Sequence, residues 1–479
     1  MLEGNSDLRS TPYQNYSPAY LATLEAQQQR SRWRLGYHIQ PRSGLINDPN
    51  GFAYFANQWH LFKQQFPFGP VHGLKSWGHL TSNDLAHWQD QGTALHPHSP
   101  YTTNGVYSGS ALPVKDRLFM MYTGNVRTAD GGRRTTQLGA WMERSGHITE
   151  LAEPLIAEPP AGYTSHFRDP QLIEHNGTYY ALIGAQRADK QGQILLYTAA
   201  APTGPWQLIG PLDFGRTTLG EMIECPNLAF VDGQVALLFC PQGMAQRDCA
   251  YQNVYPNTVV VAAGIDWQNA ALIVPSPLRL LDEGFDAYAG HVVNRPNGEA
   301  LMIAWMGLPD LSYPSDQEGW QGCYSLARRL GIRNGRLHQV PIDEPLLGPP
   351  FAPLHDKLNL QEVITLTTAA HRSGQIRLGN AQESLSLTID SAAQALTIDR
   401  TETGVPFALQ YGTKRTVPLA AGPQRLQLWL DHSSFELSVA NGQHFASGRI
   451  FPQVSAPWRM TADTGLVTAA TGRRLNNMS

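Results

Sequence analysis

The stretch NDPNGFAYFANQWHLFKQ, residues 47–64, holds an acidic residue and a proline, then an apolar run, a two-residue turn and a second apolar run. Two short apolar runs around a turn predict a β-hairpin. Asn, Asp, Pro and Gly all favour tight turns, so Asp48 alone is explained as a turn residue that hydrogen-bonds its own backbone. A further role for Asp48 depends on whether the pattern recurs.

The pattern recurs twice, at RDPQLIEHNGTYYALIG (168–184) and at ECPNLAFVDGQVALLF (224–239). In both segments an acidic residue is followed by a proline within two positions and then by a hairpin. SGSALPVKDRLFMMYTG (108–124) and AGHVVNRPNGEALMIAW (289–305) repeat the hairpin without the acidic residue. The five segments start about 55 to 65 residues apart, a spacing that predicts four-stranded blades of a β-propeller.

The rest of the chain divides around these repeats. Five blades predict a propeller over residues 36–345. A serine N-cap at Ser17, followed by proline, predicts a short helix inside an N-terminal extension of residues 1–35. A proline-rich segment predicts a linker over 346–357, and alternating polar and apolar runs predict a β-sandwich over 358–479. The expected fold is all-β, a five-bladed β-propeller followed by a C-terminal β-sandwich, with a short N-terminal helix.

The composition excludes several classes of partner and cofactor. Charged residues make up 15% of the chain and the net charge is −4, so no nucleic-acid partner is expected. No secretory signal and no run of 18 apolar residues is found, which predicts a cytoplasmic protein with no membrane partner. The cysteines form no CxxC pair and have no ligand-like spacing with histidine, so we expect no metal, no cofactor and no disulfide framework. They are Cys225, Cys240, Cys249 and Cys323.

Three acidic residues begin three of the repeats. The innermost strand of each propeller blade lines the central axis, so Asp48, Asp169 and Glu224 are expected to share one pocket. The alternative is that three turn carboxylates precede strands by chance, and the matched prolines favour the shared pocket. Carboxylates in an aromatic-rich chain without a phosphate-binding glycine loop indicate glycoside hydrolysis. One group attacks the anomeric carbon or activates water, and the other protonates the departing oxygen.

The local sequence suggests a role for each carboxylate. Glu224 lies in the most apolar context, LGEMIECPNLAF, and burial favours the protonated form that a proton donor needs. Asp48 lies in a turn where backbone NH groups and Asn47 can hold it ionised as a nucleophile. Asp169 directly follows Arg168, and adjacent strand residues face opposite ways, so both line the pocket only if the backbone departs from a regular strand. Asp169 would then hydrogen-bond sugar hydroxyls as the ring flattens.

These residues lie in motifs that resemble glycoside hydrolase family 32, the family of invertases, fructan hydrolases and sucrose-6-phosphate hydrolases. The motifs are NDPNG from Asn47, WGHLTSNDLAHW from Trp77, YSGSA from Tyr107, FRDP from Phe167, ECPNL from Glu224, DEGFDAYA from Asp282, IAWMG from Ile303, and DHSSFEL and RIFP in the tail. They cover nearly the whole chain after residue 36. The resemblance implies a five-bladed propeller with a β-sandwich and a retaining enzyme that releases fructose. It also implies that Asp48 is the nucleophile, Asp169 the transition-state stabiliser and Glu224 the acid/base.

The resemblance further implies a set of substrate contacts, each of which can alternatively be explained as blade packing, the tryptophans above all. They are Asn47, Gln64, Tyr107, Ser108, Arg168 and Trp305, with Trp77 as a wall of the fructose pocket. The chain departs from the family pattern at Leu45 and Ile46, where many members have Trp-Met, at Asn227, where many have an acidic residue, and at Lys63, which replaces an aromatic residue. No catalytic group is lost, and the expected consequence is an altered pocket rim.

FPFGPVHGLKSWGHL, residues 66–80, resembles the sucrose-6-phosphate hydrolase branch. A phosphate on the glucosyl group needs a cation near the pocket mouth, and Lys75 or His72 is expected to supply it. The alternative is that Lys75 is a solvated loop lysine. The expected substrates are sucrose 6-phosphate and sucrose, and exo-hydrolysis of short fructans is the alternative within the family.

Two other classes of protein stay open. An inverting pentosan hydrolase would also use three carboxylates, but its two catalytic groups would stand about 6.5 to 9.5 Å apart, against about 5 to 5.5 Å in a retaining enzyme. A non-catalytic sugar-binding propeller would tolerate loss of a carboxylate, and the presence of all three counts against it.

Overall fold

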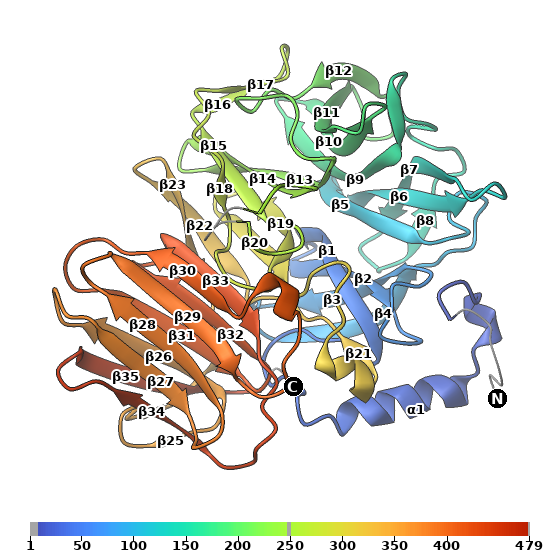
Figure 1. Ribbon diagram of the computed structural model, residues 1–479. Helices are drawn as coiled ribbons and strands as arrows, with labels where there is room; N and C mark the ends of the chain where they lie inside the picture. The colour runs from blue at the N-terminus through green and yellow to red at the C-terminus, as the bar shows by residue number, and fades with distance from the viewer. Residues whose placement is uncertain (1–7, 247–250, 478–479) are drawn as a thin grey trace.

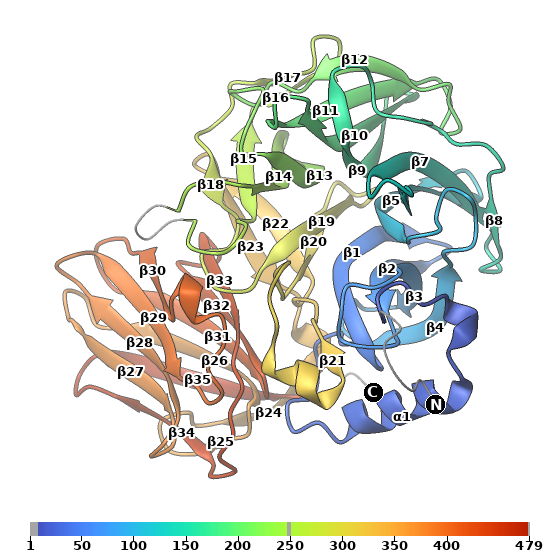
Figure 2. The same ribbon diagram turned by 45° about the vertical axis from the view of Figure 1, so that its right-hand side comes forward.

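Five sheets form the blades of a propeller in the computed structural model of the chain, which describes residues 8–246 and 251–477 (Figure 1). Their innermost strands, β1, β5, β9, β13 and β19, contact one another in chain order, and β19 contacts β1, so the ring closes. Figure 2 shows the blades following one another around this ring from blue to yellow. The predicted five-bladed propeller is confirmed, with the five repeats as the inner hairpins.

The blade strands have the following bounds. Blade 1 has β1 (Gly44–Phe55), β2 (Gln58–Phe66), β3 (Ser76–Ser82) and β4 (Trp88–Leu95), with β21 (Trp320–Gln321) added beside β1, and blade 2 has β5 (Val106–Val114), β6 (Arg117–Arg127), β7 (Arg133–Met142) and β8 (Ile148–Glu150). Blade 3 has β9 (Tyr163–His175), β10 (Thr178–Arg187), β11 (Gly192–Ala199) and β12 (Gln207–Pro211), and blade 4 has β13 (Met222–Val231), β14 (Gln234–Gln242), β15 (Thr258–Ala262) and β18 (Arg279–Leu280). Blade 5 has β19 (Tyr288–Asn294), β20 (Ala300–Trp305), β22 (Arg328–Arg333) and β23 (Arg336–Pro341), and β16 (Gly264–Asp266) and β17 (Ala271–Ile273) form a separate ribbon.

The turns of the acid-bearing hairpins have one conformation. Ala56–Asn57, Asn176–Gly177 and Asp232–Gly233 all have positive φ at both residues, between 49° and 78°. Two left-handed residues form the type I′ turn, whose twist matches that of the flanking strands and which favours Asn, Asp and Gly. This turn chemistry explains why the three hairpins could be recognised in the sequence.

The C-terminal region is a β-sandwich of two six-stranded antiparallel sheets, drawn in orange and red in Figure 1. One sheet has the order β24 (Leu347–Phe351), β35 (Val467–Leu475), β26 (Gln361–Thr368), β31 (Arg425–Asp431), β32 (Ser434–Val439) and β33 (His444–Arg449). The other has the order β25 (Lys357–Leu358), β34 (Trp458–Ala462), β27 (Gly374–Gly379), β28 (Ser384–Asp390), β29 (Ala395–Glu402) and β30 (Lys414–Pro418). Leu, Ile, Val and Phe side chains from both sheets form the sandwich core.

Residues 346–357, expected as a linker, hold strand β24, which pairs with β35. β24 is an edge strand of its sheet, and prolines are tolerated at an edge because no second neighbour needs their missing NH groups. The prolines that suggested a linker therefore mark an edge strand. The other domain limits stay predictions.

The predicted N-terminal helix is α1 (Pro18–Gln29), and the hydroxyl of Ser17 accepts a hydrogen bond from the NH of Tyr20 as its N-cap. The helix lies against blade 1. The Tyr20 hydroxyl donates to the carbonyl of Phe68, and the Gln27 amide donates to the carbonyl of Gln317.

The propeller and the sandwich meet through buried charged groups. The guanidinium of Arg328 in β22 lies 2.5 Å from the carboxylate of Glu436 in β32. The imidazole of His38 contacts Asp431 and Glu436, each at 2.9 Å, and all three side chains are fully buried. These contacts join residues that are far apart in the sequence and fix the sandwich beside blade 5.

Candidate active site

The inner strands are irregular where they carry the acidic residues. The pairing register shifts between Ile46 and Pro49 in β1, and between Glu224 and Asn227 in β13. In β9 the register shifts next to Asp169, whose φ is 64°. A bulge with a left-handed residue turns successive side chains toward the same side. Arg168 and Asp169 are thus both buried at the axis, with Arg168 Nε 4.0 Å from Asp169 Oδ2. Both side chains can line the pocket because the strand is irregular at this point.

The three carboxylates meet around Cys225. The backbone NH of Cys225 donates to Asp169 Oδ2 at 3.1 Å. Its thiol sulfur lies 3.6 Å from Asp169 Oδ2 and 3.9 Å from Asp48 Oδ2. Glu224 precedes Cys225, and Arg168 donates to Glu224 Oε1 from Nη2 at 2.6 Å and from Nε at 3.0 Å. The structure therefore brings together the groups that the repeat pattern placed in one pocket.

Asp48 is held at both its backbone and its side chain. The Ser108 hydroxyl donates to Asp48 Oδ2, and the Tyr324 hydroxyl donates to the Asp48 carbonyl at 3.0 Å. Burial raises the pKa of Asp48, the hydrogen bond from Ser108 opposes this rise, and the charge of Glu224 adds to it. The carboxylate therefore depends on donors such as Ser108 to stay ionised.

Asp169 is the most enclosed of the three carboxylates. Burial raises its pKa, Arg168 opposes the rise, and the charges of Glu224 and Asp48 add to it. Its backbone NH donates to the Thr123 hydroxyl at 3.1 Å. Three ionised carboxylates this close repel one another, which costs free energy. A positive charge that develops on the substrate would reduce this repulsion.

Glu224 has a polar environment, unlike the apolar context of its sequence. Besides Arg168, the Gln242 amide donates to its Oε2 at 2.8 Å and the Tyr288 hydroxyl donates to the same oxygen at 2.6 Å. Its side chain is 16% exposed, against 6% for that of Asp169, so Glu224 is the more accessible of the two. Ile223, the residue before Glu224, packs into the hydrophobic core instead, because side chains alternate along a strand.

Asn47 and Gln64 form a hydrogen-bonded pair beside Asp48, with the Asn47 amide donating to the Gln64 carbonyl oxygen. Lys75 Nζ donates to Asn47 Oδ1 at 2.7 Å, and the lysine is buried. The expectations for Lys75 are corrected: it is neither a solvated loop lysine nor a cation at the pocket mouth. Burial lowers its pKa to about 7, although the charge of Asp48 opposes this shift.

The two tryptophans expected at the substrate are buried in the blades. Trp77 and Trp305 have 0% and 1% of their surface exposed. The Trp77 indole donates to the Tyr107 carbonyl at 3.1 Å and packs among core side chains of blades 1 and 2. Trp305 packs against Tyr288, with ring centroids 6.2 Å apart. Packing between blades explains both, and neither forms a wall of the unliganded pocket, whereas Tyr107 is half-buried.

His72 lies at the rim, exposed to solvent, with its ring 6.1 Å from that of Trp305. The role of His72 as a phosphate-binding cation stays a prediction.

Several groups at the site were not singled out from the sequence. Cys225 lies inside the ECP segment and Tyr288 inside the DEGFDAYA segment, so both had a motif that could have indicated them. Gln242, Tyr324 and Arg133 have no such signal, because only the folded blades bring them to the axis.

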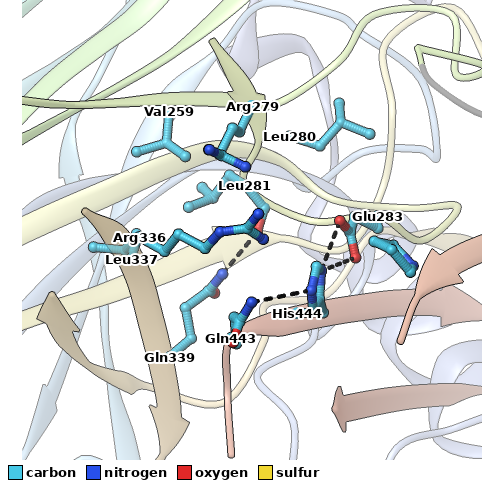
Figure 3. Close-up of a pocket in the computed structure, with 11 residues that line it drawn as sticks. Val259, Arg279, Leu280, Leu281, Glu283, Arg336, Leu337, Gln339, Gln443 and His444 are labelled. Carbon is cyan, nitrogen blue, oxygen red and sulfur yellow. Dashed lines mark hydrogen bonds and ion pairs between the residues drawn. The ribbon is translucent and has the colours of Figure 1, made fainter. Parts of the chain in front are cut away.

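A second cleft of about 150 Å³ lies between the propeller and the sandwich (Figure 3). Arg279 and Arg336 line it, and His444 Nδ1 pairs with Glu283 at 2.9 Å. Glu283 is the only carboxylate among the described residues that line this cleft, so the cleft lacks the group of carboxylates found at the propeller axis. Across residues 8–246 and 251–477, no group of three or more His, Cys, Asp or Glu side chains is placed to hold a metal ion. Within the same residues no helix is long and apolar enough to cross a membrane. Cys249 lies outside the described residues.

Three carboxylates and an arginine at the axis of a propeller are the groups that a glycoside hydrolase needs. Models of the glycosyl hydrolases family 32 N-terminal domain and of the family 32 C-terminal domain match residues 38–341 and 355–476. The chain belongs to glycoside hydrolase family 32, as the motifs predicted.

Relatives of known name and structure agree with this assignment. The chain is 45% identical to the sucrose-6-phosphate hydrolase of Pediococcus pentosaceus, over 98% of this chain and 95% of that protein. It is 39% identical, with a TM-score of 0.94, to the structure of the sucrose-6-phosphate hydrolase from Lactobacillus gasseri, over 98% of this chain and 99% of that one. A mutant β-fructofuranosidase from Bombyx mori, solved in complex with sucrose, is 25% identical with a TM-score of 0.83, over 96% and 97% of the two chains.

Proposed function

We propose that this enzyme hydrolyses sucrose 6-phosphate and sucrose, releasing fructose with retention at the anomeric carbon. The observation that carries the proposal is the meeting of Asp48, Asp169 and Glu224 around Cys225. The high identity to enzymes named sucrose-6-phosphate hydrolase supports the choice of substrate. The dianionic phosphate of such a substrate does not cross a membrane unaided, so we infer a cytoplasmic location.

The first step forms a covalent intermediate. Asp48 attacks the anomeric carbon of the fructosyl group, and Glu224 gives its proton to the departing glucosyl oxygen. Arg168, Gln242 and Tyr288 fix the orientation of Glu224 through their hydrogen bonds. The side chain of Ser108 aims Asp48 and stabilises its negative charge before the attack.

The second step releases fructose. Glu224, now ionised, takes a proton from a water molecule that attacks the anomeric carbon and breaks its bond to Asp48. Asp169 hydrogen-bonds sugar hydroxyls and strengthens these bonds as positive charge develops on the ring. Asn47 and Gln64 lie beside Asp48 and are placed to hold the same sugar.

The proposal is tested by measuring kcat/KM of the wild-type enzyme for sucrose, sucrose 6-phosphate and a short fructan. We expect the highest value for sucrose 6-phosphate, a lower one for sucrose and the lowest for the fructan. A preference for the fructan would contradict the proposed substrate. Inverted fructose, detected by NMR in the first turnovers, would contradict the proposed retaining mechanism.

A further inference from the structure

Arg133 lies at the end of blade 2 that faces the carboxylates. Tyr107 at the start of β5 pairs with Thr123 near the end of β6, and Arg127 at the end of β6 pairs with Arg133 at the start of β7. The β6–β7 hairpin therefore projects from the same edge of the blade as Tyr107 and Ser108. Side chains at the base of this hairpin therefore lie on the side of the blade that carries Tyr107 and Ser108.

The guanidinium of Arg133 lies close to the site and has no anionic partner. It sits 6.0 Å from the centroid of the Tyr107 ring, and the residue is half-buried. Its Nε is buried without a hydrogen-bond partner in the protein, and no ion pair of Arg133 is found within residues 8–246 and 251–477. A buried NH group without an acceptor costs free energy that a bound anion would recover.

Strand packing places the start of β7 on the side of Glu224, because the Thr135 hydroxyl donates to the Ser165 carbonyl in β9 at 3.0 Å, and β9 also carries Arg168, which pairs with Glu224. Burial lowers the pKa of Arg133, and the charge of Arg168 adds to this effect while that of Glu224 opposes it. The His166 ring lies 3.1 Å from Arg168 Nη1 in the same strand. Glu224 is the proposed donor to the departing oxygen, so the leaving sugar passes this side of the pocket.

Two of the other cations near the site are already engaged. Lys75 is buried and bonded to Asn47, and Arg168 is paired with Glu224. Arginine keeps its charge at all physiological pH values and binds phosphate oxygens with two parallel NH groups.

We propose that Arg133 is a specificity-determining residue that binds the phosphate group of a phosphorylated leaving sugar. The inference rests on the proposed function, and it replaces Lys75 and His72 as the source of the phosphate-binding cation.

The test compares kcat/KM for sucrose 6-phosphate and for sucrose in the wild type and in Arg133→Gln. Loss of a charge-assisted contact to phosphate should lower the ratio of the two values by about 10- to 100-fold, mainly through a higher KM for sucrose 6-phosphate. Arg133→Lys, which keeps a charge but loses the two-pronged contact, should lower the ratio less. Competitive inhibition by glucose 6-phosphate should weaken in parallel, while inhibition by glucose should change little.

Arg134→Gln is the matched control. Arg134 follows Arg133 in the strand and therefore points to the other face, where its guanidinium donates to the Pro100 carbonyl. Its ratio should equal that of the wild type. If the wild type prefers sucrose 6-phosphate and the ratio is unchanged in both Arg133 variants, the inference about Arg133 is wrong. The proposed function is then unaffected. A wild type with no preference for the phosphorylated substrate would overturn the proposed phosphate recognition itself.

Discussion

Lys75 illustrates at the residue scale what a sequence does and does not reveal. The resemblance of its segment to one enzyme branch indicated a cation near the substrate. Its actual partner, Asn47, is 28 residues away in the sequence, and only the pairing of β2 with β1 and β3 brings the two together. Burial of a loop lysine depends on such tertiary neighbours, so no local pattern could have predicted it. The same limit applies to Trp77 and Trp305, for which the sequence left a substrate contact and blade packing both open.

The charge of Lys75 lowers the pKa of Asp48, so the two residues are expected to titrate in a linked way. Because the pKa of Lys75 is about 7, the lysine is charged on the acidic side of neutrality, where Asp48 takes up its proton. Lys75→Met removes that charge, which should raise the pKa of Asp48. We expect the acidic limb of kcat/KM for sucrose to move to higher pH in a pH–rate profile. Lys357→Met, at an exposed position of the sandwich, is the control, and an acidic limb that did not move in Lys75→Met would contradict the linkage.

The element that organises the site is the bulged inner strand. The repeat of a carboxylate, a proline and a hairpin predicted the blades and the convergence of Asp48, Asp169 and Glu224, because each feature is local and is repeated. The bulges themselves left only an indirect signal, the adjacency of Arg168 and Asp169. The groups that orient Glu224 come from other strands, β14 and β19, and no spacing in the sequence relates them to it.

Gly184 tests the importance of strand spacing at the element scale. It lies in β10, and a Cβ there would come within 2.1 Å of the carbonyl oxygen of Ile223, the residue before Glu224. Gly184→Ala must push blade 3 away from blade 4, which carry Asp169 and Glu224. We expect a loss of about 1 to 3 kcal/mol in the free energy of unfolding and a fall in kcat of about 10- to 100-fold.

The matched control is Gly210→Ala in β12 of the same blade, where a Cβ meets nothing within 4 Å. This variant should keep the stability and the kcat of the wild type. Denaturant unfolding measures the stability, and sucrose hydrolysis measures kcat. Full turnover in Gly184→Ala would show that the spacing of the two inner strands does not limit catalysis.

At the scale of the whole molecule, buried charges join the propeller to the sandwich. Burial works against the charge of His38, but its hydrogen bonds with Asp431 and Glu436 raise the pKa to about 9. A histidine whose pKa is raised on folding stabilises the protein fully below its unfolded pKa of about 6.5. This stabilisation is lost as the pH rises through 9.

The contribution of His38 should be on the order of 3 kcal/mol at pH 6 and should vanish near pH 10. The free energy of unfolding is therefore expected to differ most between the wild type and His38→Gln at pH 6, and the difference should shrink toward pH 10. Unfolding in urea at several pH values measures it, with His355→Gln at an exposed position as the control. A difference that stayed constant with pH would mean that His38 is uncharged in the folded protein.

The division into a propeller and a sandwich was visible in the sequence because the pattern changes from repeated hairpins to plain alternation. The contacts between them were not visible. His38 precedes the first blade and its partners lie in β31 and β32, so only the folded chain shows that residue 38 belongs to the interface. The sandwich thereby stabilises the propeller that positions the carboxylates.

The central claim is that Asp48 is the nucleophile and Glu224 the acid/base. It is tested most directly by incubating Glu224→Gln with β-fructosyl fluoride, whose leaving group departs without a proton donor. Without a base at position 224 the fructosyl-enzyme cannot be hydrolysed quickly, so it accumulates. Mass spectrometry of the digested protein should find one fructosyl group on the peptide that contains Asp48, and none in the double variant Asp48→Asn with Glu224→Gln. A fructosyl group on Asp169, or no covalent adduct in the single variant, would contradict the account.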